Sequence, residues 1–169
     1  MQEIEELIKK AKGRDPDAFT RLMQFYMEDM YRVAIAILMN DEDVADAIQD
    51  TILTCWEKID TLREDKYFRT WMTRILINKS YDIRKKRGNS IGLEGYDQET
   101  VANDCYNFEL KEALMAMDEK YRAIMILFYS EGYRTKEIAK LLHIPQSTVQ
   151  TRLKRGREWL AKYYGVKKE

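Results

Sequence analysis

Residues 135–153 read TKEIAKLLHIPQSTVQTRL, and this stretch decides the fold of the C-terminal part of the chain. Its apolar residues are spaced so that two short helices, over about 135–142 and 146–164, share a small core. Pro145 suits the first turn of the second helix, because its missing N–H costs nothing there. The pattern therefore predicts a helix-turn-helix. The residues expected between its helices are Ile138, Ala139, Leu142, Ile144, Val149 and Leu153.

The second of these helices has two distinct faces. At about 100° per residue, one narrow arc gathers apolar and small residues that we expect to be buried. The opposite side carries amides, hydroxyls and cations, which can hydrogen-bond to base edges in a DNA major groove. A solvated basic face is the alternative, and the preceding helix favours DNA. The buried arc is Val149, Leu153, Gly156 and Leu160; the outer side is Gln150, Thr151, Lys154, Arg155 and Glu158.

The residues that could support catalysis or metal binding are few and scattered. His143 is the only histidine, and it stands at the predicted turn, where histidine tolerates a left-handed backbone. No Cys, Ser or carboxylate arrangement surrounds it. Cys55 and Cys105 lie far apart without a CxxC motif, and we expect Cys55 to be a buried small hydrophobe. We therefore expect no enzyme activity, no cofactor, no metal site and no disulfide.

The composition predicts an all-α protein. The 169 residues are 45% hydrophobic and 34% charged, with only 7 Gly and 2 Pro. The longest apolar runs, Val33–Met39 and Ala123–Tyr129, are too short to cross a hydrocarbon layer of roughly 30 Å, and the acidic start is unlike a signal peptide. We expect a soluble cytoplasmic protein.

Helical periodicity divides the chain into two parts. A turn at residues 13–17 makes Asp15 a plausible N-cap, and residues 62–67 form a charged loop. Residues 88–107 hold three of the seven glycines and no helical pattern, which indicates a flexible acidic linker between two small helical domains. The other helices expected are 4–12, 17–39, 41–58, 68–87, one around 110–117, and 121–130.

Charge is sorted along this neutral chain. Lys+Arg and Asp+Glu both total 29, but residues 61–87 hold nine basic against three acidic residues, and 134–169 hold ten against three. Residues 88–109 hold five acidic residues and none basic, and 1–60 hold fourteen acidic against seven basic. Each basic block contains a predicted helix with a polar face. The pattern indicates nucleic-acid binding at two separate places.

The N-terminal basic helix has the ingredients for holding single-stranded nucleic acid. Cations suit phosphates, an Asn can bond a base, and aromatic rings can stack on bases. The alternatives are that Phe68 and Trp71 belong to the core, and that Asp82 pairs with Arg74 or Lys85. Lys79 falls inside the expected buried arc, which is a flaw in the pattern. That arc is Phe68, Met72, Ile75, Leu76 and Ile83, and the adjoining polar stripe is Trp71, Arg74, Asn78, Asp82 and Lys85.

The acidic helix over 41–58 predicts a third surface. Asp43, Asp46, Gln49 and Asp50 recur at steps of three and four residues and form one polar strip. The general expectation for such a strip is a solvated face. Because carboxylates repel DNA, any partner of this strip should be a protein.

These motifs together resemble a known family. The stretch Asp46–Thr51, then Phe68–Ile75 with Asn78, Asp82 and Arg84–Arg87, resembles region 2 of the extracytoplasmic-function sigma factors of bacterial RNA polymerase, members of the sigma-70 family. Glu137–Ala139 followed by Thr148–Arg157 resembles region 4. Both regions occur in the family's order. Many relatives carry Arg and Ser in place of Gln150 and Thr151 and an aromatic residue in place of Lys154, so the promoter sequence does not follow.

The resemblance implies a promoter-recognition subunit that acts as a monomer within the polymerase holoenzyme. Region 2 would cover 1–87, a linker 88–107 and region 4 108–169. Asp46, Gln49 and Asp50 match the positions that dock the polymerase clamp helices, and region 4 would contact the flap. An anti-sigma factor, often membrane-anchored, restrains most members. The positions matching minus-ten recognition are Arg63, Lys66, Phe68, Trp71, Arg74, Asn78, Asp82, Arg84, Lys85 and Arg87; those matching minus-thirty-five recognition are Ser147, Thr148, Gln150, Thr151, Lys154 and Arg155.

Two other readings stay open on the residues alone. In the first, the chain is a dimeric helix-turn-helix regulator whose residues 1–87 sense a ligand or dimerise, and it binds duplex DNA by itself. In the second, it is a helical adaptor whose basic faces are only solvated. Salt-sensitive binding to nucleic acid would argue against the second reading.

Overall fold

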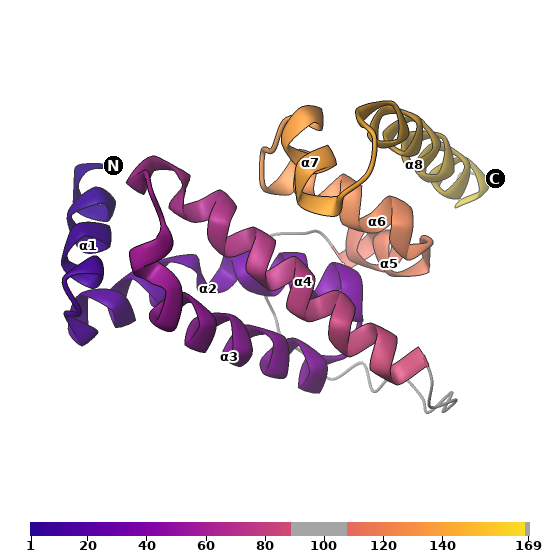
Figure 1. Cartoon of the computed structure of the whole chain (residues 1–169). Coiled ribbons are helices and arrows are strands. Elements are labelled where there is room, and N and C mark those ends of the chain that lie inside the picture. Colours follow the sequence, from indigo (N-terminus) through magenta and orange to yellow (C-terminus); the bar gives the residue numbers. More distant parts are fainter. Residues whose placement is uncertain (89–107, 168–169) are drawn as a thin grey trace. The chain divides into compact units, whose positions relative to one another are not determined.

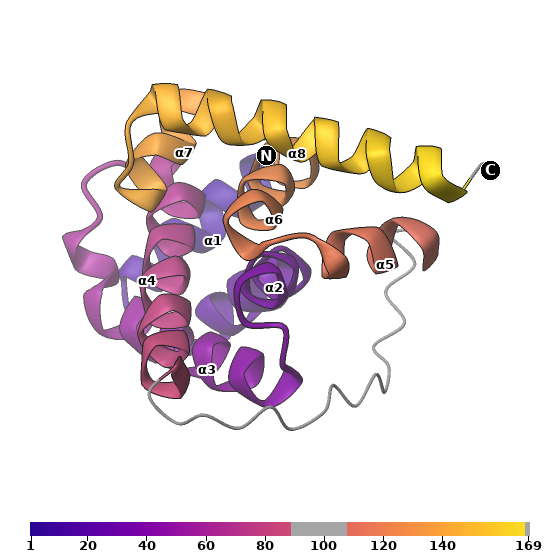
Figure 2. The same ribbon diagram turned by 90° about the vertical axis from the view of Figure 1, so that its right-hand side faces the viewer.

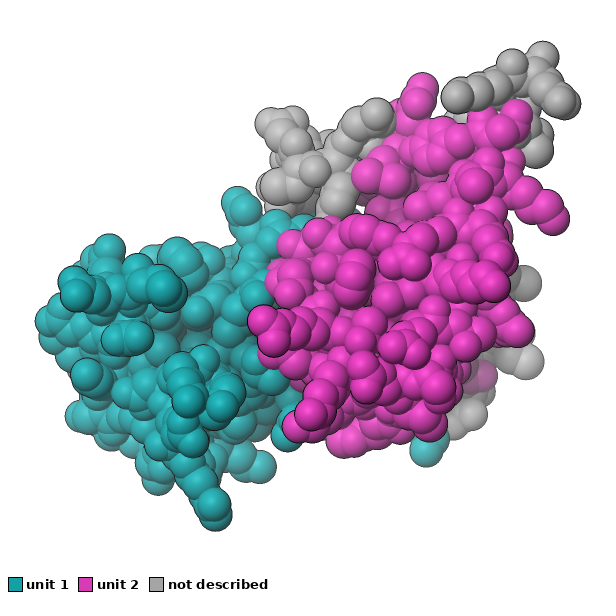
Figure 3. Space-filling view, turned by 90° about the horizontal axis from the view of Figure 1, so that it is seen from above, with its two compact units in different colours: residues 1–86 teal, residues 87–169 magenta. Residues whose placement is uncertain are grey.

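The computed structural model describes residues 1–88 and 108–167, which form helices and no strand (Figure 1). The chain divides into two compact units, Met1–Lys86 and Arg87–Glu169 (Figure 3). The expectation of an all-α protein with two helical domains is confirmed. Apart from Gly88, the predicted linker lies outside the described residues, as does Cys105. No helix in the described ranges is both long enough and apolar enough to cross a bilayer.

The N-terminal unit begins with helices whose ends are set by local hydrogen bonds. Asp15 caps the second helix as predicted, because its Oδ1 accepts from the N–H groups of Asp17 and Ala18 at 3.0 and 3.2 Å. Asn40 caps the third by accepting from the N–H of Asp43 at 3.0 Å. The elements are α1 (Gln2–Lys12), α2 (Pro16–Leu38), α3 (Asp41–Lys58), the short 3₁₀ turns η1 (Ile59–Thr61) and η2 (Asp65–Tyr67), and α4 (Phe68–Gly88).

The core of this unit surrounds α2, which packs against α1 and α3. The ring of Phe68 at the start of α4 lies 5.8 Å from the ring of Tyr26 in α2. A guanidinium–carboxylate contact of 3.5 Å between Arg69 and Asp29 joins the same two helices. Cys55 of α3 is fully buried, and burial raises the pKa of its thiol to about 12. The prediction that Cys55 acts as a small hydrophobe is therefore confirmed.

The buried face of α4 differs from the predicted arc. Ile75 and Ile83, expected in the core, are half-exposed, and Lys79 lies at the edge of the buried face. The hydroxyl of Ser80 donates to the carbonyl oxygen of Leu76 at 2.8 Å, so its polarity is satisfied within the helix and it can be buried. The buried residues are Phe68, Met72, Thr73, Leu76, Ile77 and Ser80.

The C-terminal unit contains the predicted helix-turn-helix. His143 ends its first helix with φ 55° and ψ 43°, the left-handed turn expected from the sequence. The second helix packs against α6 and α7 (Figure 2). The single helix expected over 121–130 is instead α6 continued by a π-helical turn. The elements are α5 (Phe108–Ala116), α6 (Glu119–Met125), the π-helical turn η3 (Ile126–Ser130), α7 (Thr135–Leu142) and α8 (Gln146–Lys167).

Close packing of α8 on α6 depends on one glycine. A Cβ atom placed on Gly156 would lie 2.9 Å from Sδ of Met125, closer than side-chain carbons normally approach. Val149 and Leu153 precede Gly156 on the same buried face of α8. This face therefore fixes which residues of α8 point away from the core.

Candidate nucleic-acid interface

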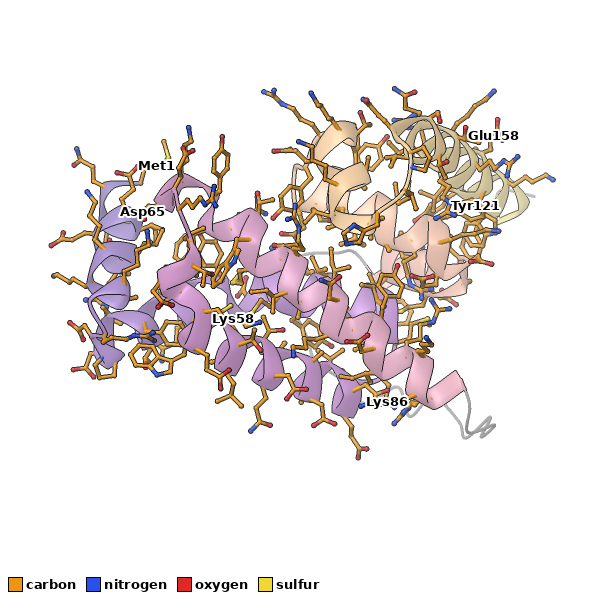
Figure 4. The ribbon with its side chains drawn as sticks, viewed as in Figure 1. Met1, Lys58, Asp65, Lys86, Tyr121 and Glu158 are labelled. Atoms are coloured by element: carbon orange, nitrogen blue, oxygen red, sulfur yellow. The ribbon has the colours of Figure 1, made fainter. Side chains whose placement is uncertain are left out.

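The outer face of α8 presents the polar residues expected from the helical projection. Gln150, Thr151, Lys154 and Arg155 are exposed, as is Glu158, which Figure 4 labels on this helix. The buried side of α8 agrees with the arc expected from the sequence except at Leu160, which is half-exposed. Of the two candidate residues at the start of the helix, Ser147 is exposed and Thr148 half-buried.

Side-chain hydrogen bonds hold the start of α8. The amide of Gln146 donates from Nε2 to Oγ1 of Thr135 at 2.9 Å, joining α8 to the first turn of α7. The hydroxyl of Thr151 donates to the carbonyl oxygen of Ser147 at 2.9 Å. Because that bond uses its only proton, Thr151 can offer a ligand only an acceptor oxygen and its methyl group. This directional constraint helps define what the face can recognise.

A hollow of about 300 Å³ lies beside this face, between the first turn of α6 and the N-terminal half of α8. Three of its residues were not anticipated, namely Lys120, Tyr121 and Arg152; Figure 4 labels Tyr121 on α6. On the helical projection Arg152 lies next to the outer arc, so the projection could have predicted that it lies near this face. The two residues on α6 come from a different helix, and no spacing in the sequence brings them to α8. The lining residues are Lys120, Tyr121, Ser147, Thr148, Thr151, Arg152 and Arg155.

The polar stripe of α4 is at the surface. Arg74, Asn78, Asp82 and Lys85 are exposed, and Trp71 is half-buried. Asp82 makes no ion pair with Arg74 or Lys85 in the described residues, so the pairing alternative does not hold in this structure. The basic end of the helix also has exposed Arg84 and Arg87, and both of these have contacts within the protein. The stripe therefore combines cations, an amide and one carboxylate.

Phe68 does not belong to this surface. Its side chain is 1% exposed and lies between the rings of Tyr26 and Trp71, with its centroid 5.8 Å from each. A base cannot stack on a ring covered in this way. The expectation that Phe68 contacts DNA is therefore wrong: it is a core residue, as the alternative interpretation held. Trp71, only half-buried, keeps part of its ring accessible.

The loop before α4 presents two of the predicted cations. Arg63 and Lys66 are exposed. Lys66 lies 3.1 Å from a carboxylate oxygen of Glu64 and over the ring of Tyr67 at 4.9 Å. The hydrogen bond to Glu64 is the main cause that raises the pKa of Lys66 above its ordinary value.

The loop is tied back to α1 at a point between these cations. The ammonium of Lys12 lies 2.7 Å from Oδ1 of Asp65, and the α1–α2 turn adds contacts from Arg14 to the carbonyl oxygen of Trp56 and, at 3.6 Å, to Asp60. Lys12 was not anticipated, because 53 residues separate it from its partner.

The acidic strip on α3 is smaller than predicted. Asp46, Gln49 and Asp50 are exposed, but Asp43 is only 6% exposed and so does not belong to the strip. Asp43 stands in the first turn of α3, where the helix dipole favours a carboxylate. Leu53 is 55% exposed and lies one turn beyond Gln49 and Asp50. The surface is thus acidic with an apolar end.

Sequence comparisons identify both units. The family model Sigma-70 region 2 matches residues 22–90, and the model Sigma-70, region 4 matches residues 107–160. The chain is 29% identical over 178 residues to the ECF RNA polymerase sigma factor SigW of Bacillus subtilis, covering 94% of this chain and 95% of that protein. The chain therefore belongs to the sigma-70 family, as an extracytoplasmic-function (ECF) sigma factor.

Solved structures have the same fold. CnrH in complex with the cytosolic domain of CnrY matches with a TM-score of 0.70 at 23% identity, over 97% of this chain and 98% of that one. The sigma factor RpoE from Bartonella quintana, in complex with the anti-sigma factor NepR, matches with a TM-score of 0.74 at 22% identity, over 88% and 97%. The family models and the named relative confirm the resemblance inferred from the motifs, and with it the expectation of a non-enzymatic regulator of transcription initiation.

Proposed function

We propose that this sigma factor recognises promoters with two surfaces that differ in the form of DNA they bind. The outer face of α8 would read the minus-thirty-five element as duplex, with Gln150 and Lys154 at base edges. The exposed stripe of α4 and the loop residues Arg63 and Lys66 would hold the melted minus-ten strand. Region 2 would occupy residues 1–87, and region 4 residues 108–169.

The observation that carries this proposal is the availability of these side chains. Gln150 and Lys154 on α8, and Arg74 and Asn78 on α4, are exposed and have no hydrogen-bond or ion-pair partner among the described residues. Because no internal contact has to be broken first, these side chains are available to an external ligand, whose contacts must then outweigh the rotamer freedom that the side chains lose on binding. Both surfaces are also cationic, as DNA binding requires.

Strand capture would offset the cost of melting. Unstacking a base costs a few kcal/mol, and base–aromatic stacking returns about 1–3 kcal/mol per base. With Phe68 buried, the accessible rings near the loop are Tyr67, which is 52% exposed, and the uncovered part of Trp71. We therefore expect Tyr67 and Trp71 to serve as stacking surfaces.

The partners follow from the acidic strip and from the relatives. We propose that Asp46, Gln49 and Asp50 bind the clamp helices of core RNA polymerase in the cytoplasm, and that region 4 contacts the flap. Both solved structures described above are complexes, one with the anti-sigma factor NepR and one with the cytosolic domain of CnrY. We propose that an anti-sigma factor, membrane-anchored as in much of the family, binds and restrains this chain.

Transcription by reconstituted holoenzyme tests the proposal. The full chain with core polymerase should select, from random promoters, sequences with conserved bases in two blocks. Gln150→Ala should relax selection at one upstream position by about 1–3 kcal/mol and leave the downstream block unchanged. Selection of the same sequences by the chain alone would support the regulator reading instead.

A further inference from the structure

The hollow beside α8 combines three cations from two helices. Lys120 comes from the first turn of α6, and the half-buried Arg152 and the exposed Arg155 come from successive turns of α8. The seven described residues that line the hollow include no carboxylate. Three like charges around one concavity repel one another, and an anion placed among them would relieve that repulsion.

The cations are also unpaired. None of the three has a hydrogen bond or an ion pair to its side chain among the described residues, and Lys120 lies only over the ring of Tyr121 at 5.1 Å. Two carboxylates precede Lys120 in the chain. Asp118 is the N-cap of α6, where it accepts from the N–H of Lys120 at 3.1 Å, and Glu119 has a contact of its own within the protein. No internal partner therefore competes with a ligand.

The remaining lining residues supply neutral hydrogen-bond groups. Ser147 and Thr148 add hydroxyls at the first turn of α8, and Tyr121 adds a phenol. Cations combined with hydroxyl donors are the groups that proteins use on phosphate oxygens. Thr151 and Arg155 line the hollow and also belong to the exposed outer face of α8, so the hollow adjoins that face.

We propose that this hollow seats one phosphodiester of the promoter backbone, with Lys120, Arg152 and Arg155 as its ligands. The inference rests on the proposed function and changes the assignment of one residue. Arg155 then positions the helix on the DNA backbone, and Gln150 and Lys154 are left to read bases. A residue outside the helix-turn-helix, Lys120, becomes part of the DNA-binding surface and sets the register of α8 along the groove.

Neutral backbone substitutions provide the test. Holoenzyme is bound to duplex promoters in which single upstream phosphates are replaced, one at a time, by uncharged methylphosphonates. The unmodified protein should lose affinity at several positions, whereas Lys120→Ala should become insensitive at one of them. Lys111→Ala, which removes an exposed and unpaired lysine of α5, should keep the full pattern. If Lys120→Ala remains sensitive to the methylphosphonate at every position where the unmodified protein is sensitive, the inference is overturned.

Salt and base changes give a second readout. Removing one phosphate contact lowers the slope of log affinity against log salt by about 0.9. Between 50 and 200 mM salt, the unmodified protein should therefore lose about 3.5-fold more affinity than Lys120→Ala or Arg155→Ala. Both variants should weaken binding to all upstream sequences equally. A loss confined to one base pair would make Arg155 a base reader and refute the assignment.

The two levels of the proposal fail separately. If holoenzyme shows no sequence preference in the upstream block, the proposed function of α8 fails before the phosphate experiment begins. If preference is present but no single phosphate couples to Lys120, only the phosphate seat is wrong.

Discussion

The ion pair between Lys12 and Asp65 provides a test of how the N-terminal unit shapes the loop that we propose holds the minus-ten strand. The pair joins the end of α1 to η2, and Asp65 stands between Arg63 and Lys66 in the loop. Lys12→Met removes the charge but keeps an unbranched side chain of similar length. We expect the variant to fold, to bind core polymerase, and to melt promoters less well, because the loop is then held by fewer contacts.

The size of the effect follows from geometry and exposure. A hydrogen bond involving a charged group contributes about 1.5–3 kcal/mol, and an exposed ion pair about 0.2–1 kcal/mol. The Nζ–Oδ1 distance is 2.7 Å and the two side chains are 26% and 23% exposed, so this pair belongs between those classes, at about 1–1.5 kcal/mol. Arg14 still holds the neighbouring segment through Trp56 and Asp60. The equilibrium constant for the loop attached to α1, relative to the released loop, should therefore fall by roughly 5- to 12-fold.

A double-mutant cycle measures this pair. Lys12→Met, Asp65→Asn and the double variant are unfolded with denaturant to give the coupling energy. The same proteins, as holoenzyme, are then followed by 2-aminopurine fluorescence at the minus-ten element. We expect each single variant to reduce bubble formation without changing upstream binding, and the exchanged pair Lys12→Asp with Asp65→Lys to recover part of the loss.

The control removes a matched contact elsewhere. Arg21 and Glu3 also pair across α1 and α2, at 3.2 Å, but their side chains are 64% and 75% exposed. Arg21→Met should change neither stability nor melting measurably. A coupling below about 0.3 kcal/mol for Lys12 and Asp65 would refute the energetic estimate. A full coupling with unchanged bubble formation would refute the link from α1 to the loop.

Three further predictions concern separate parts of the molecule. Asp50→Lys should weaken binding to core polymerase by about tenfold or more in a competition assay, while Glu57→Lys, an exposed reversal on the same helix, should not. His143→Gly should stabilise the C-terminal unit by about 0.5–1 kcal/mol by removing left-handed strain at φ 55°, and a lower Tm would contradict this. With a thiol pKa near 12, Cys55 should resist maleimide at pH 8 in a Cys105→Ser background until the protein unfolds; rapid labelling of the native protein would be inconsistent with its burial.

Local patterns made the helix-turn-helix predictable. The turn at His143, the cap at Asp15 and the buried side of α8 each depend on residues within a few positions of one another. Capping, helical periodicity and turn conformation are short-range effects, so one sequence carries enough information to place them. The same holds for the exposed residues of α4, whose stripe was correctly located although the centre of its buried face was not.

The remaining features depend on tertiary packing or on hydroxyl hydrogen bonds, which sequence patterns do not record. Ser80 is buried because its proton returns to the carbonyl oxygen of Leu76, which a hydrophobicity pattern scores as polar. Phe68 was assigned both to the core and to the interface, and only packing against Tyr26 and Trp71 decides between them. The contribution of Lys120 to the hollow depends on how α6 crosses α8, which no spacing within either helix records.

Some cations of this chain are used to hold the fold, and others are left unpaired on the faces that we propose bind DNA. Lys12 at the end of α1 and Arg14 in the turn after it contact carboxylate or carbonyl oxygens, so their charges are used to hold the fold. Arg74 on α4, and Lys154 and Arg155 on α8, have no such partner in the described parts of the chain. The neutral net charge of the whole chain is therefore compatible with DNA binding, because DNA would contact only the surfaces with a local excess of positive charge. Salt should accordingly weaken promoter binding well before it weakens the folded units.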